Sequence, residues 1–233
     1  MGETLDASRI IQTGFGFWGS KVLLTAVKLE VFTVLGARAM TGAELGNALG
    51  LHPRGIWDFF DALVALEFLR RDGDGPQARY ANTGETRAFL DKNSPEYVGG
   101  MLEMCNDRLF PFWHDLEAAL KTGQPQNEVK HSRKPMFEEL YADLPRLEQF
   151  MGAMTGISRA NFVALAEKVD FSRYQTLCDV GGATGLLSII VAKRHPHLRC
   201  TSFDLPEVAP IAAKAIRKAG LVDRVTTAAG NFQ

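Results

Sequence analysis

The stretch TLCDVGGATG, residues 176–185, decides the fold. A short apolar run over 176–180 ends in two glycines, and a mostly apolar segment over 184–194 stops before Pro196. This pattern predicts a strand, a glycine turn and a helix. Such a turn lets a ligand lie on the backbone at the C-terminal end of the strand, against the start of the helix. The stretch therefore predicts a ligand-binding turn in an α/β fold.

The alternation of strand and helix continues toward the C-terminus. The pattern predicts a second strand over 198–203, a helix over 207–219 with Gly220 at its C-cap, and a third strand over 224–229. A strand-helix-strand-helix-strand order implies a parallel sheet with right-handed crossovers. We therefore expect the first half of a doubly wound, Rossmann-like fold, with three parallel strands.

The glycine turn does not match two common phosphate-binding patterns. A dinucleotide fingerprint needs glycine at 183 and glycine or alanine at 186, where Ala183 and Leu186 stand. A P-loop is excluded because no Gly-Lys-Ser/Thr follows. A nucleoside ligand is still indicated by Asp204, nineteen residues after Gly185, where a carboxylate can accept from ribose hydroxyls. The alternative role for Asp204 is an N-cap of the following helix.

The N-terminal part predicts a helical module with a small hairpin. Residues 7–36 carry a long apolar stripe at helical spacing, which packs either in the protein's own core or against a partner subunit. Thr41 and Glu44 have the capping-box spacing, a second helix follows to residue 69, and 70–83 read as a two-stranded wing. This order is that of a winged helix, a fold that often binds DNA.

The charges on the second helix argue against DNA binding. Between residues 54 and 69 the charged side chains are Arg54, Asp58, Asp61 and Glu67, so three negatives and one positive would meet a polyanion. We expect a packing or dimerisation module instead. Further helices are predicted from Ser94-Pro95, over 112–120 and 136–142, and after Pro145.

Composition bounds the class of protein. With 233 residues, 46% of them hydrophobic, and 26 basic against 27 acidic side chains, the chain carries a packed core and no long-range field for nucleic acid or an anionic membrane. Three dispersed cysteines fit a reducing compartment, with Cys178 expected as a small core residue. The N-terminus lacks the features of a secretion signal, so we expect a cytoplasmic protein.

The chain as a whole resembles a known family. The order of winged helix, helical linker, DVGGATG at 179–185, FDLPEV at 203–208 and GNF at 230–232 is similar to the dimeric S-adenosylmethionine-dependent small-molecule O-methyltransferases. That group includes plant phenolic, acetylserotonin and bacterial antibiotic-pathway enzymes. The resemblance implies S-adenosyl-L-methionine as cofactor, methyl transfer to a hydroxyl of a small aromatic or polyketide-like metabolite, and a homodimer formed through the N-terminal helices. It implies neither a nucleic acid nor a membrane partner.

The resemblance also assigns residues. It places the cofactor against Asp179, Gly181, Gly182, Gly185, Asp204, Leu205, Gly230, Asn231, Phe232, Tyr141 and Ser158, and the acceptor against Phe150 and Met154. The amide of Asn231 and the ring of Phe232 suit the edge and face of adenine. Two positions depart from the family pattern: Ala183 replaces a glycine, which is harmless where φ is negative, and Asn231 replaces an aspartate.

The same resemblance divides the chain. It implies a winged-helix dimerisation domain over 1–93, a helical linker with substrate-lining helices over 94–170, and a partial cofactor domain over 171–233. The family's histidine base follows a fourth strand, so no catalytic residue is assigned, and we expect 1–233 alone not to methylate. The alternatives are a non-catalytic dimerisation or regulatory remnant and, third, a winged-helix DNA-binding regulator.

Overall fold

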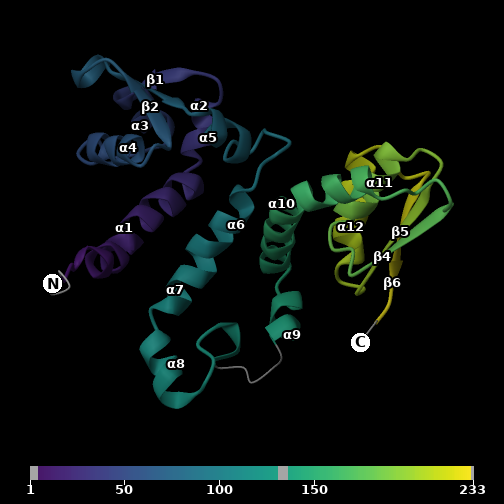
Figure 1. Cartoon of the computed structure of the whole chain (residues 1–233). Coiled ribbons are helices and arrows are strands. Elements are labelled where there is room, and N and C mark those ends of the chain that lie inside the picture. The colour runs from purple at the N-terminus through teal and green to yellow at the C-terminus, as the bar shows by residue number, and fades with distance from the viewer. Residues whose placement is uncertain (1–4, 131–135, 232–233) are drawn as a thin grey trace. The chain divides into compact units, whose positions relative to one another are not determined.

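The chain folds into two compact units. The structure is a computed structural model that describes residues 5–130 and 136–231, and its units comprise 1–111 and 112–233 (Figure 1). Each unit has its own hydrophobic core, and each is described by itself below.

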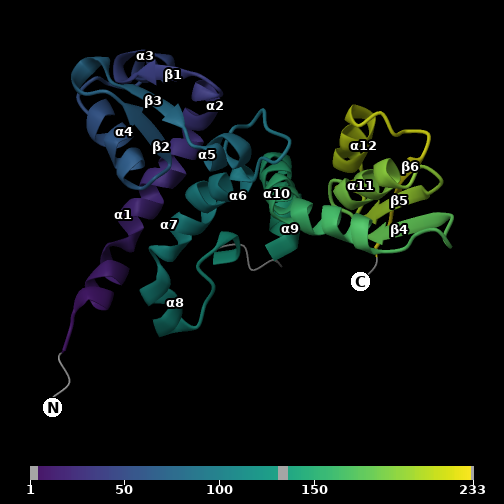
Figure 2. The same cartoon turned by 45° about the horizontal axis from the view of Figure 1, so that its top comes forward.

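The first unit is mainly helical and holds a small antiparallel sheet of order β1-β3-β2 (Figure 2). The apolar stripe over 7–36 forms two helices, as the sequence predicts. The hairpin predicted over 70–83 is also present, joined by a strand that the sequence did not reveal, β1. The elements are α1 Ser8–Lys28, α2 Val31–Leu35, β1 Ala39–Thr41, α3 Gly42–Ala48, α4 Ile56–Ala65, β2 Leu69–Asp72, a 3-10 turn Gly75–Gln77, β3 Arg79–Asn82, α5 Gly84–Phe89, α6 Gly99–Met104 and a π-helical turn Cys105–Leu109.

Local hydrogen bonds explain where these elements begin. The capping box at Thr41 is confirmed: Thr41 Oγ1 accepts from the Glu44 N–H at 3.2 Å, and Glu44 Oε2 accepts from the Thr41 N–H at 2.8 Å. The helix predicted from Ser94-Pro95 is wrong at its start. Ser94 Oγ accepts from the Glu96 N–H at 3.2 Å and closes a turn, so α6 begins only at Gly99.

The second unit combines helices with a parallel sheet. The strands predicted after residue 174 are all present, within one residue of their expected bounds. Its elements are α7 Phe110–Trp113, which crosses the boundary between the units, α8 Leu116–Thr122, a 3-10 turn Glu128–Lys130, α9 Met136–Tyr141, α10 Leu144–Lys168, β4 Thr176–Val180, α11 Leu186–Arg194, β5 Arg199–Asp204, α12 Ala209–Lys218 and β6 Val225–Ala229.

The sheet of the second unit has the order β4-β5-β6, with all pairs parallel. Asp179 on β4 is paired with Ser202 on β5, and Asp204 on β5 with Ala229 on β6. α11 packs against β4 and β5, α12 against β5 and β6, and α10 against α11. The carboxyl ends of β4 and β5 thus lie side by side, where the sequence places the glycine turn and Asp204.

The strand β4 is less buried than its sequence indicates. Cys178 is exposed and Val180 is 60% exposed, whereas Cys200 and Ser202 on β5 are buried. The expectation of Cys178 as a core residue is therefore wrong. Within the described residues β4 pairs with β5 alone, so an apolar strand sequence does not by itself give burial. In the same part of the chain, no helix is both long and apolar enough to cross a bilayer.

Candidate cofactor site

The glycine turn after β4 is held in a tight, left-handed conformation. Gly181 and Gly185 have φ of 74° and 73°, the region that glycine occupies without strain. The N–H groups of Gly181 and Gly182 donate to the Phe203 carbonyl at 2.9 and 3.2 Å, and the Gly185 N–H donates to the Gly182 carbonyl at 2.7 Å. These bonds tie the turn to β5 and start α11 at Leu186.

Gly182 is required by close packing rather than by its φ. A Cβ on Gly182 would lie 2.2 Å from Ser202 Oγ and 3.1 Å from the Asp179 carbonyl oxygen. A side chain fits there only if Ser202 Oγ rotates away and the turn shifts from the Asp179 backbone. The turn therefore rests directly on the sheet, and its outer surface faces the cavity.

Ala183 has a positive φ of 49°, so the condition under which this replacement was expected to be harmless is not met. The methyl group instead finds packing partners: Ala183 lies against the cluster of Leu147, Met151 and Val208. The side chain that costs conformational energy in the turn also adds apolar contacts, which offset part of that cost.

Asp204 joins the turn to the end of β5. Its Oδ2 accepts from the Ala183 N–H and its Oδ1 from the Leu205 N–H, both at 2.8 Å, and the residue is 6% exposed. The alternative role as a helix cap is excluded, because the N-cap of α12 is Val208 and has no side-chain cap bond. A carboxylate has about four acceptor positions, so two remain for a ligand.

Asp179 lies beneath the turn with an acceptor that is not satisfied. Its Oδ2 is buried and has no hydrogen-bond partner, as is true of Ser202 Oγ. Burial raises the pKa of the Asp179 carboxyl above its usual range, and the nearby Asp204 carboxylate raises it further. A ligand that brings a positive charge into the cavity would counter the repulsion between the two carboxylates.

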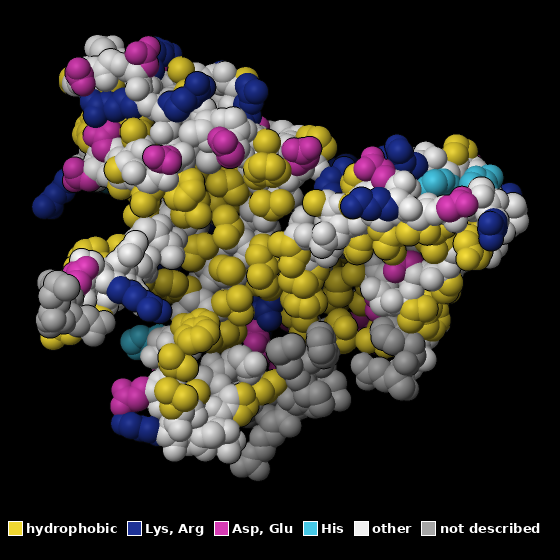
Figure 3. Space-filling view, in the orientation of Figure 1, with side chains coloured by type: hydrophobic (Ala, Val, Ile, Leu, Met, Phe, Trp, Pro, Cys, Tyr) yellow, Lys and Arg dark blue, Asp and Glu magenta, His cyan; other side chains and the backbone are white. Residues whose placement is uncertain are grey.

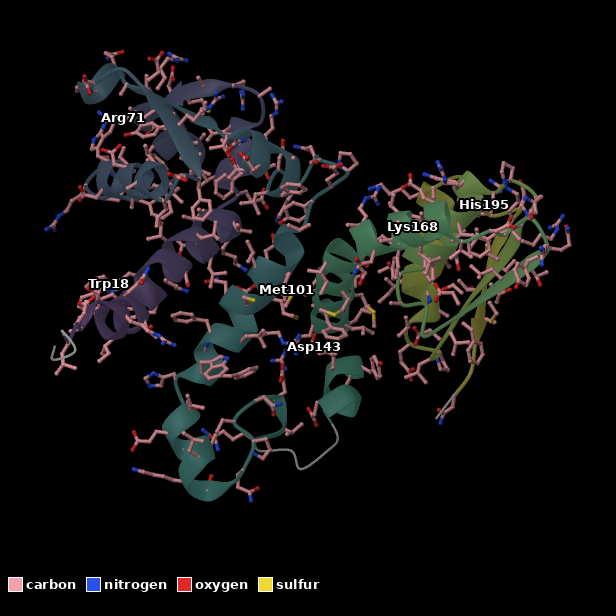
Figure 4. All side chains as sticks on the ribbon, viewed as in Figure 1. Trp18, Arg71, Met101, Asp143, Lys168 and His195 are labelled. Carbon is pink, nitrogen blue, oxygen red and sulfur yellow. The ribbon has the colours of Figure 1, made fainter. Side chains whose placement is uncertain are left out.

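A cavity of about 330 Å³ opens between α10, the end of α9 and the glycine turn. Figure 4 labels Asp143 and Lys168, which mark the two ends of α10. The cavity brings together eight of the predicted site residues: Tyr141, Phe150, Met154, Ser158, Asp179, Gly181, Gly182 and Asp204.

Other predicted residues lie near the cavity without lining it. Gly185 shapes the turn from behind, where a Cβ would meet Ile216 at 3.6 Å. Leu205 donates its N–H to Asp204, and the Gly230 N–H donates to the Asp204 carbonyl at 3.0 Å. Asn231 is exposed and does not line the cavity, and Phe232 lies outside the described residues.

Six residues that were not assigned to the cofactor or the acceptor also line the cavity. They lie on α10, in the glycine turn or at the start of α11: Met151, Thr155, Phe162, Ala183, Thr184 and Leu186. On α10, Thr155 follows Met151 by four residues and Phe162 follows Thr155 by seven, which is helical spacing. That spacing could have identified these residues beside Met154 and Ser158. Thr155 Oγ1 donates to the Met151 carbonyl at 2.7 Å and lies 2.8 Å from Thr184 Oγ1, so Thr184 donates to Thr155.

The fold and the cavity define the class of protein. A tight glycine turn, a carboxylate at the end of the next strand and an apolar helix face surround one cavity at the carboxyl edge of a parallel sheet. This is the arrangement of a nucleoside-binding α/β protein.

Comparison with known proteins identifies the family. The O-methyltransferase domain matches residues 113–233, and the O-methyltransferase dimerisation domain matches 11–92. The chain belongs to the O-methyltransferase family, as the resemblance indicated. It is similar to the tetracenomycin polyketide synthesis 8-O-methyl transferase TcmO of Streptomyces glaucescens, with 38% identity over 96% of this chain. The N,N-dimethyltransferase OxyT of Streptomyces rimosus is 35% identical over 97% of this chain.

A solved structure supports the same assignment. Human N-acetylserotonin methyltransferase, solved in complex with SAM, matches with a TM-score of 0.84 and 26% identity over 100% of this chain and 68% of its own. The chain spans 64% of the length of TcmO and 65% of the length of OxyT.

Proposed function

We propose that this chain forms the cofactor-binding and dimerisation parts of an S-adenosylmethionine-dependent O-methyltransferase acting on a hydroxyl of a small aromatic or polyketide-like molecule. The observation that carries the proposal is the charge of the cavity: two carboxylates, Asp179 and Asp204, line it, and among the described lining residues there is no Lys, Arg or His. A phosphate-bearing cofactor would be repelled there, whereas S-adenosylmethionine has a sulfonium, an ammonium and no diphosphate.

The residues of the cavity fit that cofactor. The glycine turn leaves room for a ligand against the backbone, and Asp204 keeps two acceptor positions for ribose hydroxyls. The charge of the Asp179 carboxylate, at the wall of the cavity, suits a positively charged group. Once bound, the cofactor supplies an electrophilic methyl group for in-line displacement.

The chain's own part in the reaction is to hold two reactants in line. Phe150, Met154 and Phe162 give the α10 side of the cavity an apolar surface for a flat acceptor and exclude water from it. Burial and the charges of Asp204 and Glu207 raise the pKa of Tyr141, so its phenol stays protonated at neutral pH and can donate to the cofactor or the acceptor. No described lining residue is assigned as the base for the acceptor hydroxyl.

The names of the relatives allow either oxygen or nitrogen as the atom that accepts the methyl group. TcmO is named as an O-methyl transferase and OxyT as an N,N-dimethyltransferase. The hydroxyl is our first choice because the family domain that matches is that of O-methyltransferases. The non-catalytic remnant is disfavoured, because such a protein has no need of a formed cofactor cavity.

Equilibrium dialysis with methyl-labelled S-adenosylmethionine tests the proposal. We expect residues 1–233 to retain one cofactor per chain. Absence of retention would contradict the assigned site. Incubation with hydroxylated or aminated naphthoates extends the test, because the structure of any labelled product would give the acceptor atom.

We further propose that the chain forms a homodimer through the N-terminal helices of a winged-helix module. Along the N-terminal half of α1, large apolar side chains are exposed: Ile10 is 74%, Phe15 52% and Trp18 59% exposed (Figure 4). The dimerisation domain matches the same region. Trp18→Glu should convert the dimer to a monomer in sedimentation, whereas Leu120→Glu, at a 78% exposed residue of the other unit, should not. An unchanged dimer in Trp18→Glu would exclude α1 as the interface.

A further inference from the structure

A second polar cavity lies in the first unit, among β2, β3, α5 and the turn after α2. Its volume is about 270 Å³, and its charged lining residues are Arg38, Arg70 and Arg87. All three arginines are exposed to solvent, and no carboxylate lines the cavity in the described part of the chain. The cavity therefore carries three positive charges in a chain with a net charge of −1.

Hydrogen bonds to the backbone hold two of these arginines in place. Arg38 Nη2 donates to the Val34 carbonyl at 2.6 Å, and Arg70 Nε donates to the Asn82 carbonyl at 3.3 Å. Each guanidinium has five N–H donors, so most donors of both remain for a ligand. Asn82 is 5% exposed, and its Nδ2 donates to the Phe32 and Gly36 carbonyls at 2.8 and 3.0 Å. It thereby joins the wall formed by β3 to the turn after α2.

One carboxylate lies close to the wall of the cavity. Asp91 Oδ2 lies 3.9 Å from the position that a Cβ on Gly36 would take, and Asp91 Oδ1 accepts from Asn93 N and Nδ2. Its single negative charge is smaller than the three positive charges of the arginines. No ion pair joins Arg38, Arg70 or Arg87 to a carboxylate among residues 5–130 and 136–231. Arginines that share a cavity repel one another, and an anion bound between them removes that repulsion.

We propose that this cavity binds a small phosphorylated molecule or inorganic polyphosphate. Arginine forks match the oxygens of a phosphoryl group and bind it through charge-assisted, bidentate hydrogen bonds. The lining is more polar than apolar, which suits a small anion better than a carboxylate ligand with a large carbon skeleton. The site is separate from the glycine-turn cavity, which belongs to the other unit.

A nucleic acid is the less suitable occupant. Binding to DNA requires basic groups along an extended face, and α4, the helix that would enter a groove, carries Asp58 and Asp61 and no basic residue. Arg71 and Tyr80 both bind Asp61, at 3.1 and 2.7 Å, so this nearby arginine is already paired. The helix that would enter a groove therefore lacks the basic face that DNA binding requires.

Isothermal titration of the 233-residue chain with inorganic pyrophosphate tests the proposal, with ribose 5-phosphate as the second arm. We expect saturable 1:1 binding to at least one probe, and the tighter probe indicates whether a polyphosphate or a phosphate monoester is the natural class. Arg87→Gln should weaken the binding about tenfold, the loss expected for one charge-assisted contact. The double variant Arg38→Gln with Arg87→Gln should abolish it.

Arg54→Gln is the matched control, since Arg54 is also exposed, lies in the same unit and is outside the cavity. It should change the affinity less than twofold. Lack of saturable binding, or equal weakening by Arg54→Gln, would overturn the proposal. Tighter binding of a short DNA duplex than of either probe, with a strong dependence on salt, would also overturn it and would indicate a nucleic-acid surface.

Discussion

The two cavities differ in the sign of the charge that lines them. The cavity at the glycine turn is lined by the carboxylates of Asp179 and Asp204, whereas the cavity in the first unit is lined by three arginines. Both are of similar size, about 330 and 270 Å³. Because the volumes are similar, the charge of the lining residues decides which class of ligand each cavity suits. A cationic cofactor suits the cavity at the glycine turn, and a phosphoryl anion suits the cavity lined by arginines.

The cavities also differ in how they are supported. The glycine-turn cavity has a sheet edge beneath it and an apolar wall on α10. Hydrophobic side chains cover much of the visible surface at the place of α10 (Figure 3). The arginine cavity has a mostly polar lining, held by side-chain hydrogen bonds to backbone carbonyls. An apolar wall suits an acceptor beside the cofactor, and its absence suits a single anion.

The largest change should come from Gly182→Ala, which would remove the cofactor cavity and leave the arginine cavity intact. The added Cβ would lie 2.2 Å from Ser202 Oγ and 3.1 Å from the Asp179 carbonyl oxygen, so Ser202 must rotate and the turn must shift on the sheet. We expect S-adenosylhomocysteine affinity to fall at least about 100-fold, by the several-kcal/mol cost of such overpacking. Fluorescence or calorimetric titration measures the loss.

Gly152→Ala is the matched control for that change. A Cβ on Gly152 meets nothing within 4 Å, and the residue lies within α10, where alanine is favoured over glycine. We expect unchanged cofactor affinity and equal or higher stability. Pyrophosphate binding should persist in both variants, and its loss in Gly182→Ala would show that the two cavities are not independent.

Asp204→Asn should weaken cofactor binding about tenfold to 100-fold. The amide replaces one acceptor oxygen by an NH₂ group that faces the N–H of Ala183 or Leu205, and it can no longer accept from both ribose hydroxyls. The ligand-induced rise in the thermal midpoint reports the loss. Asp223→Asn, at an exposed residue outside the cavity, controls for the change in charge, and an equal effect there would refute a specific role for Asp204.

Asp179→Asn should raise the stability of the chain at pH 7 and weaken its binding of the cofactor. Because the folded-state pKa of Asp179 is raised from 3.8, its favourable contribution is fully present below that value and is lost as the pH rises through the folded pKa. The asparagine side chain does not ionise, so the variant does not lose stability in this way as the pH rises. At pH 7 we expect a thermal midpoint about 2 °C above that of the wild type, with the gap closing toward pH 3.

The same variant should bind the cofactor more weakly, since a charge that attracts the ammonium or sulfonium is gone. Midpoints measured between pH 3 and 7, with and without S-adenosylhomocysteine, separate the two effects. A variant that is less stable than the wild type at pH 7 would contradict the pKa direction.

Of the four changes at the glycine-turn cavity, Thr155→Val should have the smallest effect on cofactor binding. It removes the acceptor that Thr184 uses at 2.8 Å and so loosens the tie between α10 and the glycine turn. We expect roughly a fivefold loss of cofactor affinity, as for one neutral hydrogen bond, and recovery in Thr155→Ser. Failure of serine to restore binding would show that shape, rather than the hydroxyl, matters at this position.

The sequence predicted the glycine turn and its sheet well, because the strand and helix signals there are local. Asp179, Gly182 and Asp204 were placed in the cofactor site by their spacing and by the family pattern, and the structure brings them to one cavity. The face of α10 that carries Thr155 and Phe162 was missed, because which side of a long helix meets the turn depends on tertiary packing.

Other features could not be read from local patterns. The positive φ of Ala183 follows from its hydrogen bond to Asp204, twenty-one residues away in the chain. The exposure of Cys178 depends on which strands flank β4 rather than on its own sequence. The arginine cavity gathers residues from four elements, at positions where each arginine alone looks like an ordinary surface residue.

The two cavities are proposed to bind ligands of opposite charge, and one calorimetric titration tests this most directly. S-adenosylhomocysteine is titrated into the 233-residue chain, first without and then with saturating pyrophosphate. We predict a saturable 1:1 heat that is unchanged by pyrophosphate and is reduced at least about tenfold in affinity in Asp204→Asn. Absence of a saturable signal, or an affinity that Asp204→Asn leaves unchanged, would contradict the assignment of the acid-lined cavity as the cofactor site.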